Sequence, residues 1–351
     1  MAKDSVKKLR VGFVGAGGIA GTHANNYQNM PDVEIVAASD VSEKGLKAFQ
    51  EKYKVPQVFT DWKQMLKECE LDAVSVCTPN FLHCEPTIGA LNAGCHVLCE
   101  KPLAMSAAEG RRMLAAAKKN KKQLVIAFQF RFDGKTQALR RAYDEGFFGK
   151  VLYVRVKAIR RRGIPNWGVF GRKELQGGGP LIDIGVHALE MAHYAVGAPQ
   201  PQSALGFTWT YLGNKPSNTA CSWPNWDWKT YTVEDLAVGT IRTKNGPVFH
   251  LESAFVAHTD QEGMDFTIFG EKGGAQWSTT SLYHDHAGMM VNSTPAFVAK
   301  RDGFVHKMRH FVDVCQGKCK TEAPAEHGLM VQQMLDGIYA SAKQGKEVKI
   351  K

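Results

Sequence analysis

The chain has 351 residues, of which 44% are hydrophobic and 22% charged, and its 44 basic and 34 acidic side chains give a formal net charge of +10. This length exceeds one ordinary domain and predicts two, and the composition excludes an intrinsically disordered protein. No apolar run approaches the ~18 residues of a membrane helix, and no nucleic-acid-binding motif surrounds the basic cluster at 155–162. We therefore expect no membrane and no nucleic-acid partner. The basic excess is interpreted as a solvated face that would also attract an anionic substrate or cofactor.

The N-terminus and the cysteines indicate the cellular compartment. Residues 1–18, MAKDSVKKLRVGFVGAGG, are basic and then apolar, as in a signal peptide. The apolar part is short, is broken by glycines and has no small-residue cleavage site, so we expect no signal peptide. The eight cysteines form no C-x-x-C pair, which is typical of reduced core cysteines. Together these features predict a cytoplasmic protein.

The first predicted strand, 9–15, runs into a helix through a glycine-rich turn of the form G-x-G-x-x-A. In that pattern the first glycine permits a tight turn, the second lets a pyrophosphate approach the backbone, and the small third residue lets helix and strand pack closely. The pyrophosphate is expected at the helix N-terminus, where free N–H groups favour anions. The cofactor-binding residues predicted in this turn are Gly15, Gly17, Gly18, Ile19 and Ala20.

The next predicted strand, 33–40, supports this interpretation of the glycine turn. It ends in Asp40, twenty residues after Ala20. That spacing is typical of a carboxylate that hydrogen-bonds the ribose hydroxyls of NAD. The same carboxylate would repel a 2′-phosphate, so NAD is favoured, while Ser39 and Lys44 nearby keep NADP as an alternative.

Predicted helices and strands continue to alternate up to residue 130. Further helices are expected at 43–53, after an N-cap at Asp61 and after an N-cap at Ser106. Further strands are expected at 57–60, 71–80, 96–102 and 123–130. Repeated β–α units with apolar strands predict an N-terminal Rossmann domain, a doubly wound parallel α/β sheet, over residues 1–129. Ligands of such sheets bind beyond the carboxyl ends of the strands.

From about residue 151 the pattern changes to strands joined by turns. Strands are predicted at 150–161, 233–243, 248–258 and 264–277, and helices at about 304–316 and 325–344. This pattern predicts a C-terminal α+β domain with a mixed sheet over residues 130–351. We expect the last helix to pack back on the first domain.

Five sequence blocks resemble the Gfo/Idh/MocA family of NAD(P)-dependent oxidoreductases, which includes inositol and sugar dehydrogenases. The blocks are GFVGAGGIAGTH, VSVCTPNFLHCEPTIGALNAGCHVLCEKPLA, QFRF, GGGPLIDIGVHALE and AEHGLMVQQMLDGIYASAKQGKEV. Their order and spacing extend over nearly the whole chain, and the T-P-N-x-x-H and E-K-P pair is highly specific. The resemblance implies an open-faced sheet in the second domain, used for homodimer or homotetramer contacts.

The resemblance also implies roles for individual residues on the cofactor side. The residues that match the block lining the nicotinamide are Thr78, Pro79, Asn80 and His83. Glu100 and Lys101 match the family's E-K-P, in which the lysine reaches both the nicotinamide ribose and the reacting hydroxyl of the substrate. The peptide bond before Pro102 is expected to be cis. Gln129, at the end of its predicted strand, matches a further cofactor or substrate contact.

Asp183 and His187 match the family's D-x-G-x-H and are expected to form the reaction centre with Lys101. Oxidation of a secondary alcohol needs a proton acceptor, and the ordinary pKa of histidine lies near neutrality, so His187 is the first candidate for the base. Asp183, four residues earlier, would share its face of a helix and bind the substrate or bias the imidazole. Lys101 would stabilise the developing alkoxide, or act as the base itself if burial lowers its pKa.

The substrate wall is predicted in residues 160–187. Trp167 suits the apolar face of a sugar ring, and Arg160 or Lys173 could hydrogen-bond its hydroxyls. The tryptophan-rich loop 221–235 is interpreted as a lid, a carbohydrate platform or an oligomer contact. The histidines and the aspartate near residue 187 match no familiar ligand spacing, so no metal is expected.

These observations predict an NAD-dependent dehydrogenase acting on a secondary hydroxyl of a sugar, glycoside or cyclitol, with NADP possible. One alternative is a family member that uses NAD transiently to cleave a glycosidic bond, as a hydrolase or lyase. A second is a sugar sensor without catalysis, against which the intact set of Lys101, Asp183 and His187 argues.

Overall fold

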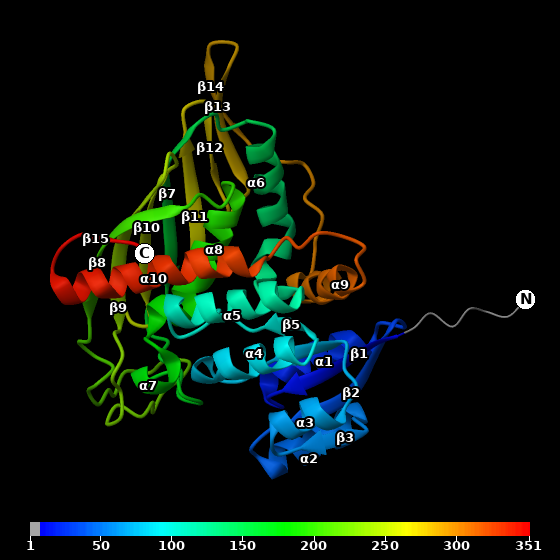
Figure 1. Ribbon diagram of the computed structural model, residues 1–351. Coiled ribbons are helices and arrows are strands. Elements are labelled where there is room, and N and C mark those ends of the chain that lie inside the picture. Colours follow the sequence, from blue (N-terminus) through cyan, green and yellow to red (C-terminus); the bar gives the residue numbers. More distant parts are fainter. Residues whose placement is uncertain (1–7) are drawn as a thin grey trace, which may run out of the picture. The chain divides into compact units, whose positions relative to one another are not determined.

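The structure is a computed structural model that describes residues 8–351, and its chain forms two compact units (Figure 1). Unit 1 comprises the chain up to Gln129 together with Asp302–Gly328, and unit 2 comprises Phe130–Arg301 together with Leu329–Lys351. Residues 302–328, which were assigned to the second domain from the sequence, thus group with unit 1. Each unit is built around its own sheet.

Unit 1 contains a six-stranded parallel sheet in the order β3-β2-β1-β4-β5-β6. The strands are β1 (Leu9–Val14), β2 (Val33–Ser39), β3 (Gln57–Phe59), β4 (Ala73–Val76), β5 (His96–Cys99) and β6 (Leu124–Ile126). The strand order reverses beside β1, so the carboxyl ends of β1 and β4 form the switch point at which such sheets bind ligands. The predicted Rossmann sheet is confirmed.

Helices alternate with these strands in unit 1. They are α1 (Gly18–Gln28), α2 (Glu43–Tyr53), α3 (Trp62–Glu68), α4 (Cys84–Asn92) and α5 (Ala107–Asn120), and the later α9 (Gly303–Cys315) packs against α1. Both predicted N-caps are confirmed, because Asp61 accepts a hydrogen bond from the Lys63 amide and Ser106 accepts one from the Glu109 amide. The cysteines of the described chain are free thiols.

Unit 2 contains a mixed nine-stranded sheet in the order β14-β13-β12-β11-β7-β10-β9-β8-β15. The strands are β7 (Val151–Ile159), β8 (Pro201–Trp209), β9 (Leu236–Thr243), β10 (Val248–Ala254), β11 (Gly263–Gly270), β12 (Gly273–Gln276), β13 (Ser281–His286), β14 (Met289–Ser293) and β15 (Val348–Lys349). The parallel pair β7–β10 makes the sheet mixed, as predicted. The single strand expected at 264–277 is a hairpin instead, because the chain turns between Gly270 and Gly273.

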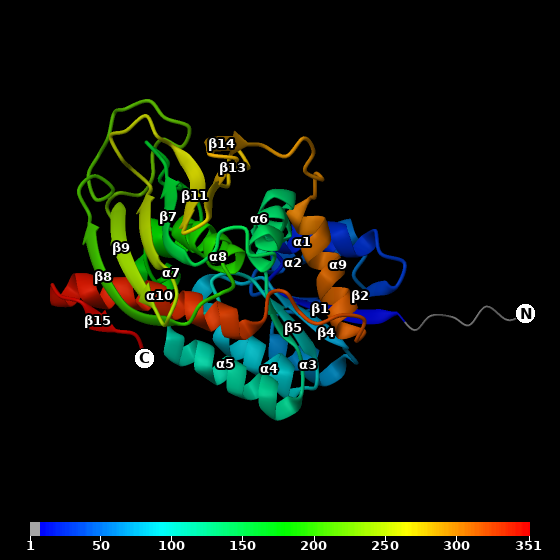
Figure 2. The same cartoon turned by 90° about the horizontal axis from the view of Figure 1, so that it is seen from above.

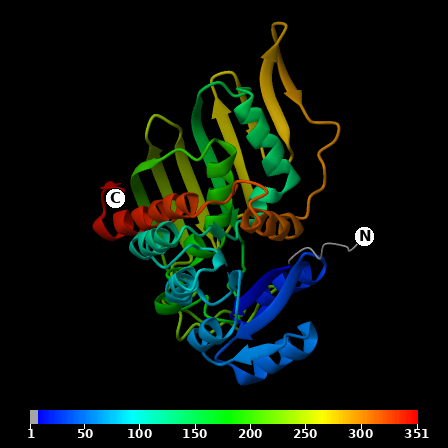
Figure 3. The same ribbon diagram turned by 45° about the vertical axis from the view of Figure 1, so that its right-hand side comes forward.

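Helices cover one face of this sheet. They are α6 (Gly134–Asp144), α8 (Val186–Ala195) and α10 (Ala325–Gln344), while the short helix α7 (Lys173–Gln176) lies in the segment before the three glycines 177–179. Figure 2 shows the strands as a curved layer with α8 and α10 beside it, and Figure 3 shows α10 lying across the strands. Gly206 and Gly239 permit this approach, because a Cβ at either position would collide with Ile338 of α10.

The other face of the unit 2 sheet is left open. On β8 the side chains of Leu205, Phe207 and Trp209 are 39%, 49% and 46% exposed, whereas Ala204 and Gly206 are buried. The rings of Phe207 and Trp209 stack with their centroids 6.1 Å apart. Among residues 8–351, no helix combines the length and the apolar character needed to span a bilayer.

Candidate functional site

The turn between β1 and α1 requires a glycine at its first position. Gly15 has φ +93°, a conformation that side chains rarely adopt, and a Cβ there would lie 2.6 Å from the carbonyl oxygen of Cys77. The turn is then held by Asp40, whose carboxylate accepts hydrogen bonds from the amides of Ala16 (2.7 Å) and Ser42 (2.8 Å). Asp40 thus joins the glycine turn to the end of β2.

Gly17 and Gly18 have a different environment from Gly15. Both are exposed, and a Cβ at either position would meet no protein atom within 4 Å. Gly17 is the N-cap of α1 and provides no side-chain cap, so the first amides of the helix remain available to a ligand. Open space in front of free N–H groups suits a pyrophosphate. Nothing in the protein itself explains why these positions are glycine, whereas a bound dinucleotide would.

The remaining residues of the predicted turn differ in burial. Ala20 is fully buried, which agrees with the close helix–strand packing expected of its small side chain, and Ile19 is partly exposed. The Asp40 carboxylate is half-buried and its two oxygens have lone pairs beyond those used by the two amides. A ribose hydroxyl could therefore still donate to it.

The T-P-N segment after β4 continues the same edge of the sheet. Pro79 is exposed, the Thr78 hydroxyl donates to the carbonyl of Leu82 at 3.0 Å, and Asn80 begins the short 3₁₀ helix Asn80–Leu82. The side chain of His83 is fully buried, with Nδ1 2.7 Å from the Pro102 carbonyl oxygen and Nε2 3.0 Å from that of Thr78. We therefore interpret His83 as a positioning residue that links the two turns.

Burial lowers the pKa of His83, and its two carbonyl contacts oppose that change. A neutral imidazole carries one N–H, so it donates to one of the two carbonyls at a time. The expected contact between His83 and the cofactor stays a prediction.

The E-K-P segment follows β5, and the Lys101–Pro102 bond is cis, as predicted. Lys101 is half-buried, whereas Glu100 is buried and points into the protein. One Glu100 oxygen lies 3.0 Å from Nε2 of His23 and 3.1 Å from Nζ of Lys307, and the other accepts the Lys101 amide at 3.2 Å. Glu100 thereby anchors the backbone of Lys101, and its contact with the cofactor stays a prediction.

His23 and Lys307 were not predicted from the sequence. Both are fully buried, and they also contact each other at 3.0 Å. Burial raises the pKa of Glu100, but the Lys307 charge and the His23 hydrogen bond outweigh it, so the net shift is downward. Burial, reinforced by the Lys307 charge, lowers the pKa of His23 to about 4. At neutral pH Glu100 is therefore a carboxylate and His23 a neutral imidazole.

The sequence predicts Gln129 at the end of a strand, but the structure places it outside the sheet. Strand β6 ends at Ile126, and Gln129 begins a 3₁₀ turn, Gln129–Phe132. The apolar run 123–130 resembles a longer strand, but the backbone leaves the sheet before its apolar residues end. Gln129 is half-buried, and its proposed contact with a ligand stays a prediction.

In unit 2, Asp183 and His187 lie on the segment that follows the three glycines 177–179. Asp183 is in a π-helical turn, Leu181–Gly185, and His187 is in the first turn of α8. Both side chains are buried, and the ring of Phe130 meets the His187 imidazole edge-on, with centroids 5.2 Å apart. A π turn is wider than an α turn, so the predicted four-residue helical spacing is only partly realised.

Close packing requires a glycine at position 179, in the turn before Asp183. A Cβ at Gly179 would collide with the carbonyl oxygen of Glu234. The buried Glu234 carboxylate accepts the amides of Gly179 (2.9 Å) and Leu181 (3.2 Å) and the hydroxyl of Tyr339 (2.8 Å). Glu234 and Tyr339 therefore hold the turn that carries Asp183, a role that the sequence did not predict for either residue.

A second buried pair joins Arg131 to Glu190 of α8, one turn beyond His187. Nε of Arg131 is 2.6 Å from the Glu190 carboxylate, both side chains are fully buried, and the guanidinium lies 5.1 Å from the Tyr194 ring centroid. Burial raises the pKa of Glu190 to about 7, although the Arg131 charge opposes the shift. Arg131, which belongs to the QFRF block, therefore helps to fix the position of α8.

The predicted substrate-wall residues gather around the tryptophan loop. The guanidinium of Arg160 lies 4.9 Å from the ring centroid of Trp223, and the indole of Trp167 meets Trp223 at 4.8 Å with the ring planes at 90°. Burial lowers the pKa of Arg160, and the Asp183 charge raises it. Arg160 is thus within electrostatic reach of Asp183, while Trp167 is 50% exposed.

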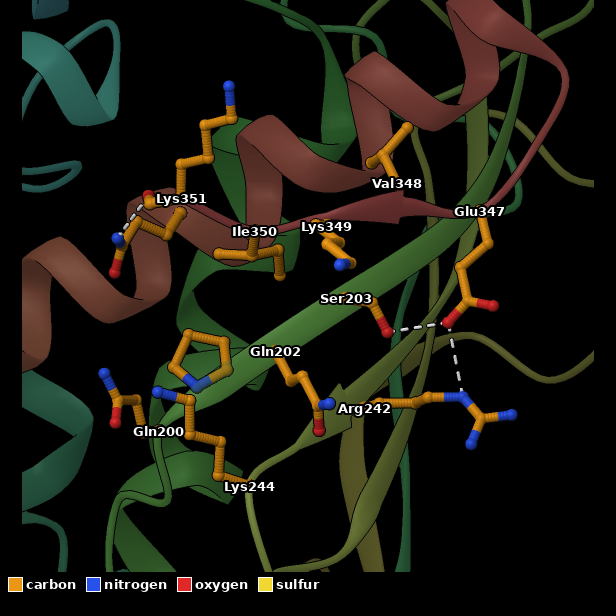
Figure 4. A pocket seen from close by; sticks show the side chains of 12 residues that line it. Gln200, Gln202, Ser203, Arg242, Lys244, Glu347, Val348, Lys349, Ile350 and Lys351 are labelled. Carbon is orange, nitrogen blue, oxygen red and sulfur yellow. Dashed lines mark hydrogen bonds and ion pairs between the residues drawn. The ribbon is translucent and has the colours of Figure 1, made fainter.

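A hollow of about 800 Å³ in unit 2 is lined by none of the predicted site residues (Figure 4). It lies beside β15. There the Glu347 carboxylate accepts a hydrogen bond from the Ser203 hydroxyl and forms an ion pair with Arg242. In the part of the chain that the structure describes, no group of three or more His, Cys, Asp or Glu side chains is arranged to hold a metal ion.

Comparison with known proteins identifies the family. The sequence profile described as "Oxidoreductase family, NAD-binding Rossmann fold" matches residues 9–128, and that described as "Oxidoreductase family, C-terminal alpha/beta domain" matches residues 140–350. The chain belongs to the Gfo/Idh/MocA oxidoreductase family. Among Gfo/Idh/MocA proteins, the D-glucoside 3-dehydrogenase of Escherichia coli is 39% identical over 344 residues, which cover 97% of both chains.

Two further comparisons agree with this family. The levoglucosan dehydrogenase of Pseudarthrobacter phenanthrenivorans is 28% identical over 291 residues, covering 76% of this chain and 73% of that protein. A solved structure of levoglucosan dehydrogenase in complex with NADH has a TM-score of 0.84 at 21% identity and covers 98% of this chain and 100% of that one, so the two share a fold. The chain is an NAD-dependent dehydrogenase of the Gfo/Idh/MocA family, and the open turn at Gly17 and Gly18 fits the cofactor.

Two glycine variants separate the role of the cofactor from that of the fold. We expect Gly17→Ala to leave the melting temperature unchanged and to weaken NAD binding about tenfold or more, because the new methyl occupies space in front of the helix amides. Gly15→Ala should lower the melting temperature, because its φ is positive and its Cβ would collide with the Cys77 carbonyl. Thermal melts give the melting temperature of each variant, and calorimetric titrations give its affinity for NAD. Wild-type NAD affinity in Gly17→Ala would show that the pyrophosphate does not use this turn.

Because His23 is buried, we expect the free energy of unfolding to depend on pH in the acid range. Unfolded His23 takes up a proton near its ordinary pKa of 6.5, whereas the folded protein resists protonation until about 4. Stability should therefore fall as the pH drops from about 6.5 to about 4, by up to about 3 kcal/mol. His23→Gln should lack this loss.

The measurement is the free energy of unfolding of both proteins, from urea titrations at a series of pH values. Glu190, with its raised pKa, contributes in the opposite direction between about 4.5 and 7, but it does so in both proteins and cancels in their difference. Parallel pH profiles of wild type and His23→Gln would contradict the prediction.

Proposed function

We propose that this dehydrogenase oxidises a secondary hydroxyl of a sugar, glycoside or cyclitol, and that Lys101, Asp183 and His187 carry the reaction. The observation on which this proposal chiefly rests is the buried Asp183–His187 segment. Burying a carboxylate and an imidazole is costly unless they are paired, and such groups gathered in one segment are candidates for a functional site. The names of the relatives support the substrate class, since they act on a D-glucoside, levoglucosan and myo-inositol.

NAD, when bound, accepts the hydride that leaves the carbinol carbon. The proton of the same hydroxyl needs a base, for which we propose His187, because its imidazole is held by α8 and by the edge of the Phe130 ring. We propose that the Lys101 ammonium stabilises the oxygen as its negative charge develops. Lys101 remains the alternative base.

Asp183 has a separate proposed role. Its carboxylate lies within the charge field of Arg160 and on a turn fixed by Glu234, so it is suited to accept hydrogen bonds from substrate hydroxyls or to orient the imidazole. We propose that Arg160 binds the substrate from the same wall. On the cofactor side, Asp40 is proposed to bind the ribose and to favour NAD over NADP.

The activity proposal is tested with nicotinamide absorbance against a panel of glucosides, inositols and sugar acids, with NAD and with NADP. We expect Lys101→Met and His187→Asn each to lower kcat/KM by about 100-fold or more, because proton transfer and alkoxide stabilisation are each lost. Lys244→Met, which removes an ammonium from the hollow of Figure 4, is the matched control and should leave the rate unchanged.

Other outcomes of this experiment point to the alternative functions. Loss of a glycoside that requires NAD but releases no NADH would indicate redox-assisted bond cleavage, as a hydrolase or lyase. Binding of a sugar without any reaction, in the wild type and with both cofactors, would indicate a sensor.

We also propose that the open face of the unit 2 sheet joins copies of this chain into a homodimer or homotetramer. The contiguous exposed side chains of Leu205, Phe207 and Trp209 support this, because large exposed apolar patches usually mark interaction surfaces. A second copy presenting the same face would cover these side chains symmetrically.

Light scattering after size exclusion tests the assembly. We expect wild type to elute as an oligomer and Phe207→Lys to dissociate at micromolar concentration, since the substitution places a charge in the apolar face. Phe297→Lys is the control, because Phe297 is exposed but lies outside the sheet. A monomeric wild type, or an oligomeric Phe207→Lys, would contradict the proposal.

A further inference from the structure

A second pocket in unit 2 lies between the segment 164–172 and the tryptophan loop. Its volume is about 260 Å³, just below the range of about 300–1,000 Å³ usual for drug-sized ligands. It therefore has room for one ring. The aromatic residues that line it are Trp167, Trp226 and Tyr231.

The aromatic walls of this pocket are rigidly held. The indole N–H of Trp226 donates to the Gly213 carbonyl at 2.8 Å, and the Tyr231 hydroxyl donates to the Glu234 carbonyl at 3.1 Å. Both side chains are buried, and their polar atoms are used within the protein. Trp167 is the exposed member, so its ring face is available to a ligand.

Polar groups surround the same hollow. The side chains of Asn166, Arg172, Asp227 and Thr230 are exposed along it. The Asp227 carboxylate accepts the Thr230 hydroxyl at 2.7 Å, and the Asn166 amide donates to the Pro224 carbonyl at 2.7 Å, so both are oriented before any ligand arrives. An apolar wall with oriented polar groups at its edge matches the apolar face and equatorial hydroxyls of a sugar ring.

Two sets of contacts connect this pocket to Asp183. In the first, Trp167 contacts Trp223, Trp223 lies under the guanidinium of Arg160, and Arg160 is within the field of Asp183. In the second, Tyr231 bonds to the backbone of Glu234, whose side chain holds the turn that precedes Asp183. The pocket is therefore adjacent to the substrate wall and not an isolated surface hollow.

We infer that this pocket is a subsite for the second sugar ring of a disaccharide whose first ring is oxidised. The inference rests on the proposed function and narrows its substrate class from sugars in general to glycosides with a cyclic sugar as aglycone. The tryptophan loop 221–235 then acts as a carbohydrate platform, one of the three roles that its composition allowed.

The test compares kcat/KM for cellobiose and maltose with kcat/KM for the matching methyl β- and α-glucopyranosides. We expect wild type to prefer at least one disaccharide about tenfold or more. Trp167→Ala and Asp227→Ala should each reduce that ratio about tenfold, mainly through KM, because a ring contact and a hydrogen bond are lost. Trp228→Ala is the control, since Trp228 is exposed on the same loop but does not line the pocket.

Calorimetric titration of the wild type with each disaccharide separates this inference from the proposed function. Methyl glucoside oxidation without any preference for disaccharides would overturn the subsite and leave the dehydrogenase proposal intact. Disaccharide binding that Trp167→Ala weakens, without oxidation of any sugar, would support the subsite and overturn the proposed function. An equal ratio in wild type and Trp167→Ala would also overturn the subsite.

Discussion

The ion pair between Glu100 and Lys307 is the interaction on which the cofactor unit depends. Removing two charges from water costs several kcal/mol for each ion, and only close geometry and further hydrogen bonds offset it. Here the carboxylate also contacts His23 and the Lys101 amide, so both of its oxygens have partners. Loss of Lys307 alone would leave a buried carboxylate without its counter-charge, a change that typically costs about 3–5 kcal/mol. The position of the Lys101 backbone is tied to that balance.

Unit 2 also contains a buried glutamate that holds the backbone, but its carboxylate is stabilised by hydrogen bonds and not by an ion pair. The Glu234 carboxylate is buried against two backbone amides and the Tyr339 hydroxyl, and it thereby defines the turn before Asp183. Burial raises the pKa of Glu234, and the hydrogen bonds oppose that shift. In both units a buried glutamate accepts hydrogen bonds from the backbone near a proposed catalytic residue and holds that backbone in place. Such support restricts the positions that Lys101 and Asp183 can adopt.

Features that depend on residues close in sequence were predictable, whereas features that depend on contacts between distant residues were not. The G-x-G-x-x-A turn, the caps at Asp61 and Ser106 and the alternation of strands and helices depend on residues close in sequence, so they were predictable. The buried partners of Glu100 and His83 were not predictable, because each contact depends on which element packs over the side chain in the folded chain. Lys307 illustrates the limit, since a lysine on an amphipathic helix is normally exposed and only its carboxylate partner explains its burial. The end of β6 was missed because an apolar run continues past the last strand residue.

The return of residues 302–328 to unit 1 has a consequence for synthesis of the chain. Glu100 and Lys307 are 207 residues apart, so the ribosome releases the carboxylate long before its counter-charge exists. At about 5–20 residues per second, the interval is about 10–40 s. During that time the first sheet can pair its strands, but the site that will bury Glu100 lacks α9. The cofactor unit is therefore completed only after most of unit 2 has been translated, although its own sheet comes first in the chain.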